Sequence, residues 1–260
     1  MKAATSGHYR KTDNHGPRRV DRVYGNHLIP REAIVDVETL TGDGADHRHI
    51  PQRLPDAWFD PFFGQLPTTG ASRLRRVAAI SLVHLVTGGT RAEARRLLGM
   101  PDTFTSGTSM STAWLRDNAD AFTNALHNLA DHLDASTNLV NYGHRRQHLG
   151  NWSIPAEQWA ETVLEHANPI PAHRTPPDWG DHKRRFVSWM VWTAVTSGER
   201  RLAPTSILPA TKDRDHEHDR TRIVHYRHEL NRATGPHRRQ LAKIIDRYTE
   251  QTITAVDARS

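Results

Sequence analysis

The chain has 260 residues, a formal net charge of +6 and no cysteine, which excludes disulfide frameworks, thiol catalysis and cysteine-ligated zinc. Its 35 basic residues comprise 30 arginines and 5 lysines, and the planar guanidinium group of arginine suits contact with phosphate. The basic balance therefore favours an acidic polymer such as nucleic acid as partner, although a GC-rich genome explains the arginine bias equally well.

Residues 1–50 are polar and rich in glycine, aspartate, histidine and arginine. We expect a basic, partly disordered segment there, because it offers few apolar side chains to bury. Residues 1–20 contain no apolar stretch of the kind found in secretory signals. The longest apolar run, near residues 186–195, is far shorter than the roughly 20 residues of a membrane span. The sequence thus predicts a cytoplasmic protein with no membrane partner.

A helix-turn-helix-like unit is predicted between residues 73 and 99. An apolar run ends at Gly88-Gly89, as a left-handed helix stop requires. Thr90 and Glu93 then form the T-x-x-E pattern of a capping box, which starts a second, arginine-rich helix. Gly99 ends that helix. A buried helix, a glycine turn and a basic helix in this order are typical of helix-turn-helix proteins.

A long helix over residues 111–134 follows, with its apolar residues alternately four and three positions apart. This single stripe indicates packing against the core, and a homodimer interface is the alternative. The stripe consists of Leu115, Ala119, Phe122, Leu126, Leu129 and Leu133.

Further helices are expected near residues 153–164, 182–197, 217–233 and 237–254, and no segment alternates with the period of a strand. The fold class predicted is all-α, with two related helix-turn-helix-like units and a C-terminal helical pair. Prolines cluster in 168–181, which suggests a linker. The expected domains are an N-terminal segment (1–50), a helical domain (51–167), the linker (168–181) and a second helical unit with the C-terminal helices (182–260).

An internal similarity supports the two related units. A shift of 109 residues, from Arg75 to Arg184, aligns the pattern R-R-Φ-x₈-V-T-x-G-x-R, where Φ is apolar, with a second copy of itself. The pattern ends at Arg91 in the first copy and at Arg200 in the second. A matched helix, glycine stop and following arginine indicate a repeated helical module.

Basic helix starts and hydroxyl-rich turns could together form a track for DNA phosphates. Few side chains that read base edges accompany them, so the pattern favours binding to the backbone of duplex DNA. The alternative is an ordinary arginine-faced surface helix. The expected DNA-binding residues are Arg75, Arg76, Arg91, Arg95, Arg96, Thr105, Ser106, Thr108, Ser109, Arg145, Arg146, Lys183, Arg184, Arg185, Arg200 and Arg201.

Three segments, 74–101, 142–159 and 181–204, resemble the helical part of the TniQ-like family of actinobacteria. The matching positions are Arg145, Arg146, Leu149, Trp152, Ile154, Pro155 and Trp159, and then Val195, Thr196, Gly198, Glu199, Ala203 and Pro204. The resemblance covers roughly residues 50–210. It implies an adaptor that binds DNA or a DNA-targeting complex and recruits transposition proteins to a target. Members often carry a cysteine-ligated zinc ribbon, which this chain lacks.

The sequence offers weaker grounds for an enzyme, and we expect none. His216, His218, His225 and His228 lie among carboxylates, but no familiar metal-binding spacing is present. No phosphate-binding loop, dinucleotide-binding glycine motif or nucleophile elbow occurs. We therefore expect no metal and no cofactor. The alternatives to a DNA-binding adaptor are a protein scaffold that does not touch DNA and, less favoured, a nuclease with histidine as general acid and base.

A chelator tests the expectation that no metal is bound. Because we expect no metal, adding EDTA to the purified chain should change neither its melting temperature nor its affinity for DNA. A structural metal contributes directly to the folding free energy, so its removal would lower the melting temperature. Differential scanning fluorimetry with and without chelator measures this. A clear drop in melting temperature would mean that the histidine-rich segment holds a metal after all.

Overall fold

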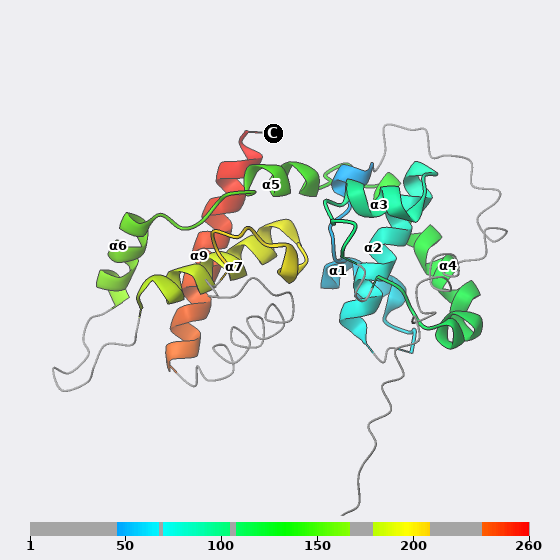
Figure 1. Ribbon diagram of the computed structural model, residues 1–260, viewed down its shortest axis with the longest axis horizontal. Helices are drawn as coiled ribbons and strands as arrows, with labels where there is room; N and C mark the ends of the chain where they lie inside the picture. Colours follow the sequence, from blue (N-terminus) through cyan, green and yellow to red (C-terminus); the bar gives the residue numbers. More distant parts are fainter. Residues whose placement is uncertain (1–45, 68–69, 105–107, 167–178, 209–235, 260) are drawn as a thin grey trace, which may run out of the picture.

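The computed structural model describes residues 46–67, 70–104, 108–166, 179–208 and 236–259. Eight α-helices and two short 3-10 helices occur in these ranges and no strand does, which confirms the all-α fold class. The helices gather into an N-terminal and a C-terminal group, joined through a short helix, α5 (Figure 1). The expected N-terminal tail and the expected helix at 217–233 lie outside the described residues, apart from 46–50.

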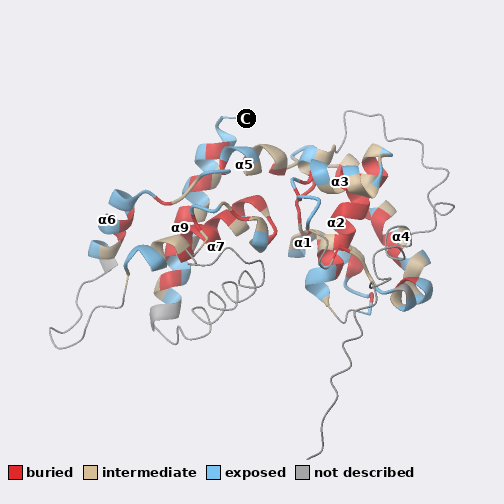
Figure 2. Ribbon diagram, viewed as in Figure 1, coloured by how far each residue is buried: buried red, intermediate tan, exposed pale blue. Residues whose placement is uncertain are grey.

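The N-terminal group is built around α2 (Ala71–Thr87), which is buried along nearly its whole length (Figure 2). This agrees with its sequence, because few polar side chains interrupt its apolar positions. The neighbouring elements are η2 (His47–His49), α1 (Asp56–Phe63), α3 (Arg91–Leu97) and α4 (Thr112–Asp134). The apolar stripe of α4, from Phe122 to Leu133, lies in this core. It therefore packs within the chain, as the core interpretation expects.

The C-terminal group is built around α7 (Asp181–Thr196), which packs mainly against α9 (Pro236–Asp257). The helices α5 (Tyr142–His148) and α6 (Ala156–His166) and the 3-10 helix η3 (Arg200–Leu202) complete it. Trp189 and Trp192 of α7 are almost fully buried against apolar side chains of α9 such as Ile244 and Tyr248.

The buried apolar residues form two clusters that divide between Leu133 and Leu149. Leu149, Ile154 and Trp159, which belong to the expected helical domain 51–167, pack with the C-terminal cluster. The expected N-terminal segment also ends earlier, since Ile50 is fully buried in the first core.

The similarity between the two groups extends beyond the pair of helices aligned in the sequence. Arg75 donates a hydrogen bond to the carbonyl of Leu54, and Arg184 donates one to the carbonyl of Ile154. Each of these carbonyls precedes a proline, and a helix, α1 or α6, begins directly after it. In both groups an arginine of one helix, buried in the first and half-buried in the second, thus bonds to the start of an earlier helix.

The helix stops are equivalent as well. With the shift of 109 residues, α2 and α7 end at matching threonines, and the next residue is left-handed in both. Gly88 has φ 64° and Ser197 has φ 43°. The groups then diverge, because α3 follows the first stop and only the short η3 follows the second.

Polar contacts hold the two groups together. The side chain of Gln52 donates to the carbonyl of Leu98 and accepts from the backbone N–H of Glu199. The Glu199 carboxylate also forms an ion pair of 2.6 Å with Arg76 of α2, and both side chains are largely buried. These contacts satisfy the buried polar atoms of Gln52 and Glu199, which the cost of burying such atoms requires.

Gly88 provides a test of the helix stop. No atom lies within 4 Å of the position that a β-carbon would occupy there, so Gly88→Ala meets no clash and only the left-handed backbone opposes it. We expect a loss of about 1 kcal/mol in unfolding free energy, measured by urea denaturation. Gly88→Asn should lose less, because asparagine tolerates this conformation better. Equal losses for both variants would contradict this explanation.

Candidate nucleic-acid interface

Most of the arginines expected to contact DNA are engaged within the protein. In the N-terminal group, Arg75 forms ion pairs with Asp56 at 2.7 Å and with Asp60 at 3.0 Å, in addition to its bond to a carbonyl. Its guanidinium also lies over the ring of Phe59. Arg76 is paired with Glu199 across the junction. Both side chains are about nine-tenths buried, so they stabilise the fold and offer little surface to a phosphate.

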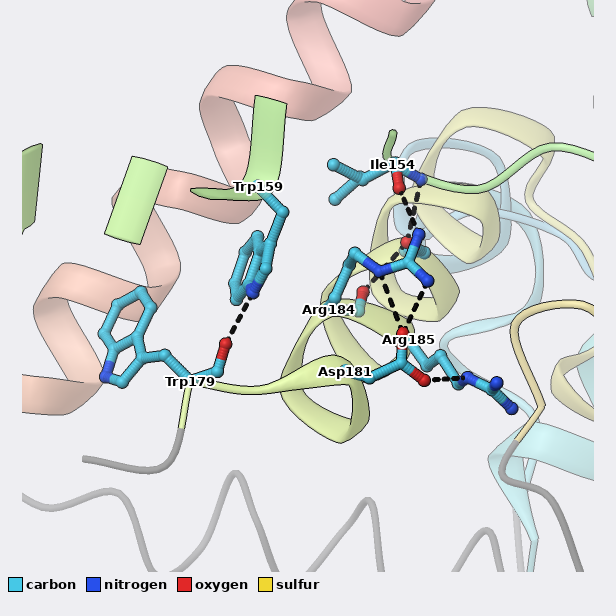
Figure 3. A network of polar contacts seen from close by, with 7 residues as sticks. Ile154, Trp159, Trp179, Asp181, Arg184 and Arg185 are labelled. Carbon is cyan, nitrogen blue, oxygen red and sulfur yellow. Dashed lines mark hydrogen bonds and ion pairs between the residues drawn. The ribbon is translucent and has the colours of Figure 1, made fainter. Parts of the chain in front are cut away.

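The same holds in the C-terminal group. Arg145 is buried and holds both carboxylate oxygens of Asp257, while it donates a further bond to the carbonyl of Val195. Arg184 and Arg185 both pair with Asp181 at the start of α7, as Figure 3 shows. These contacts tie the ends of α5, α7 and α9 to their neighbours.

An aromatic contact lies beside this network. The indole N–H of Trp159 donates to the backbone carbonyl of Trp179, and the two rings are stacked with centroids 5.7 Å apart (Figure 3). Trp159 is buried, so its ring is occupied by packing. Among the remaining expected residues, Lys183 lies over Phe186, Arg200 lies over Trp189, and Arg201 is exposed on η3.

The arginines of α3 differ from these. Arg91 and Arg95 are half-buried, yet neither forms an ion pair with a carboxylate in the described part of the chain. Burial, and then the neighbouring charge of Arg95, lower the pKa of Arg91 to about 10. Nε of Arg95 is buried without a hydrogen-bond partner among the described residues. Arg96 is exposed and reaches Asp102 only at 3.8 Å.

The hydroxyl residues expected to contact DNA are poorly placed to do so. Thr108 is buried, and its backbone carbonyl accepts a hydrogen bond from Arg91. Ser109 is half-buried, and Thr105 and Ser106 lie outside the described residues. At the N-terminus of α3, Thr90 and Glu93 form the predicted capping box, which satisfies their own two N–H groups.

A groove of about 370 Å³ lies where the two groups meet. Its walls include Arg96 and Leu97 of α3, Arg146 and Gln147 of α5, and Trp192 of α7, with Gln52 between the groups. Arg146 donates one long hydrogen bond, 3.4 Å, to the carbonyl of Ile50, and burial lowers its pKa to about 10. We refer to this site as the junction groove.

Sequence reasoning identified Arg96 and Arg146 but not that they share a groove, because they lie 50 residues apart. It missed Gln52, Leu97 and Trp192 altogether. One sequence feature could have pointed to Gln52. It lies two residues before Leu54-Pro55, just as Trp152 lies two residues before Ile154-Pro155 in the second group. Nothing in the sequence distinguishes the paired arginines from the unpaired ones.

Comparison with protein-family models, with curated proteins and with solved structures gave no match for this chain. The functional argument therefore rests on its own residues. No described helix is long and apolar enough to cross a membrane. The described residues also contain no group of three or more histidine, cysteine, aspartate or glutamate side chains able to hold a metal ion. The histidine-rich segment at 216–228 lies outside them.

The contact between Arg145 and Asp257 predicts a pH dependence. Hydrogen bonds from Arg145 hold the pKa of Asp257 below its ordinary value of 3.8. The resulting stability is present above that value and is lost as the pH falls through the lowered pKa of the folded state. Because the carboxylate is nearly half exposed, we expect Asp257→Asn to cost only about 1 kcal/mol near neutral pH.

Urea denaturation over a pH series checks this expectation. The difference between wild type and Asp257→Asn should shrink as the solution is acidified below the ordinary pKa of an aspartate. Asp246→Asn, at an exposed position of the same helix, is the matched control and should change stability little. A difference that stays constant with pH would show that the ionised carboxylate is not responsible.

Proposed function

We propose that the protein is a DNA-binding adaptor that contacts the phosphate backbone of duplex DNA with Arg91 and Arg95 of α3. The observation that carries this proposal is the pair Arg91 and Arg95, two neighbouring, half-buried guanidinium groups without a carboxylate partner in the described chain. Desolvating a charge without compensating it is costly. An anion supplied by a ligand would remove that cost.

The helix dipole strengthens the argument for Arg91. A cation in the last turn of a helix is favourable, which accounts for Arg95 and Arg96 without any ligand. Arg91 occupies the first turn, where a positive charge is unfavourable, and its burial adds to the cost. Its hydrogen bond to the carbonyl of Thr108 offsets only part of this. A DNA phosphate close to α3 would satisfy both Arg91 and Arg95.

The structural role of the paired arginines narrows the interface. Five of the expected arginines each have a carboxylate partner: Arg75, Arg76, Arg145, Arg184 and Arg185. A track of DNA phosphate contacts that crosses both groups therefore receives little support. The proposed interface is therefore one face of the N-terminal group. A role in selecting targets for transposition rests on the resemblance to TniQ-like proteins, and in that role the protein binds and recruits without catalysing a reaction.

Substituting Arg91 and Arg95 together with alanine tests the proposal. We expect weaker binding to labelled duplex DNA in fluorescence anisotropy, because two phosphate contacts are lost. The slope of log affinity against log salt concentration should become shallower by about 2. Helicity measured by circular dichroism should not change.

Arg73→Ala combined with Arg116→Ala is the matched control, because it removes the same charge from exposed positions on α2 and α4. Arg95→Gln is a second variant that leaves the contact between Arg91 and Thr108 intact. If the α3 double variant and the control double variant lose the same affinity, only net charge matters. If neither loses affinity, α3 does not contact DNA.

A further inference from the structure

The junction groove has the composition of a binding site and no role in the contacts proposed for DNA. It combines two guanidinium groups, Arg96 and Arg146, with the apolar side chains of Leu97 and Leu202. Its volume of about 370 Å³ lies near the lower end of the range typical of ligand sites, about 300–1,000 Å³.

The charge in the groove is uncompensated. Arg146 is half-buried, and no described carboxylate pairs with it. Its single hydrogen bond to Ile50 is long, and a guanidinium group has five N–H donors to satisfy. Arg96 is exposed at the mouth of the groove and only loosely associated with Asp102. Both groups are therefore available to an anionic group that enters the groove.

The apolar wall sets a second requirement on the ligand. Leu97 is 40% exposed and is one of two large hydrophobic residues exposed in the described part of the chain. It stands next to Arg96 on α3, and Leu202 and Pro204 face the same groove. A ligand that covers these side chains gains hydrophobic free energy, which a bare phosphate cannot provide.

The remaining lining suits a polypeptide backbone. Gly99 and Gly150 line the groove without side chains, so an extended chain can approach their backbone closely, whereas at Gly143 Arg48 occupies that space. Gln147 is exposed beside them, and its amide can both donate to and accept from a peptide group. Main-chain hydrogen bonds combined with pockets for individual side chains are a common way of recognising short peptide segments.

We propose that the junction groove binds a short segment of a partner protein in which a carboxylate side chain lies next to a large apolar side chain. The carboxylate pairs with Arg146 and Arg96, and the apolar side chain covers Leu97 and Leu202. The inference rests on the proposed adaptor function for its biological role, but the binding itself is independent of DNA. It would give the protein a second surface, apart from Arg91 and Arg95.

Selection from a phage library of short random peptides tests this proposal with the full-length chain. Peptides retained by the wild type and released by the Arg96→Glu variant should share an aspartate or glutamate close to leucine, isoleucine or phenylalanine. The affinity of the most enriched peptide should fall about tenfold or more in Arg96→Glu, because a charge-assisted contact becomes a repulsion. Leu97→Ser should weaken the same peptide through its apolar side chain.

Arg201→Glu is the matched control. It makes the same change of charge at an exposed position of η3 outside the groove lining, and it should bind the peptide like the wild type. The proposal is overturned if no peptide is enriched, if the enriched peptides lack a carboxylate, or if both glutamate variants lose the same affinity. Binding of a labelled single-stranded oligonucleotide that depends on Arg96 and Leu97, in place of a peptide, would overturn it too.

The two proposals fail separately. If the protein binds no duplex DNA, and the double variant Arg91→Ala with Arg95→Ala still binds the peptide, the groove proposal holds and the DNA interface is rejected. Duplex binding that depends on Arg91 and Arg95, with no peptide enriched, would do the reverse.

Discussion

The fold depends on buried and half-buried arginines that neutralise carboxylates and satisfy backbone carbonyls. Arg75 and Arg184 do this at equivalent places, each reaching the carbonyl before a proline at the start of an earlier helix. Arg145 does the same for the end of α7 while it binds Asp257 of α9. A low-hydrophobicity chain with a basic composition thus uses its guanidinium groups as structural elements. Arginine serves this purpose well, because its donors are fixed in a plane and its long apolar stem can be buried together with them.

This use of arginine divides the basic residues into two populations. One population is matched by acidic side chains and holds the helices together. The other, on α3 and α5, has positive charge that the described chain does not neutralise, and Arg91 even opposes the dipole of its own helix. Unmatched buried charge is costly and therefore informative about ligands. Both proposals follow from this second population, and they assign it to two different surfaces: a face of α3 for phosphate and the junction groove for a carboxylate.

Much of the helical architecture could be predicted from the sequence, because it depends on local chemistry. The glycine stop at Gly88, the capping box of Thr90 and Glu93, and the apolar stripe of α4 act within a few residues of the chain. The division into two cores could not be predicted, because it depends on which helix Leu149 and Trp159 pack against. The roles of the individual arginines could not be predicted from the sequence either. Arg145 and Arg146 are adjacent in sequence, yet one is bound to a carboxylate 112 residues away and the other lines a groove.

The contacts of Gln52 have a consequence for how the chain unfolds. Its amide bonds one backbone atom in each group, the carbonyl of Leu98 and the N–H of Glu199, and it is buried while doing so. Leu98 belongs to the same group as Gln52, whereas the bond to Glu199 forms only while the two groups are in contact, so separating them leaves the N–H of Glu199 without this partner. That penalty couples the two cores energetically. The two similar helical groups are in this way linked by a buried polar contact at their junction.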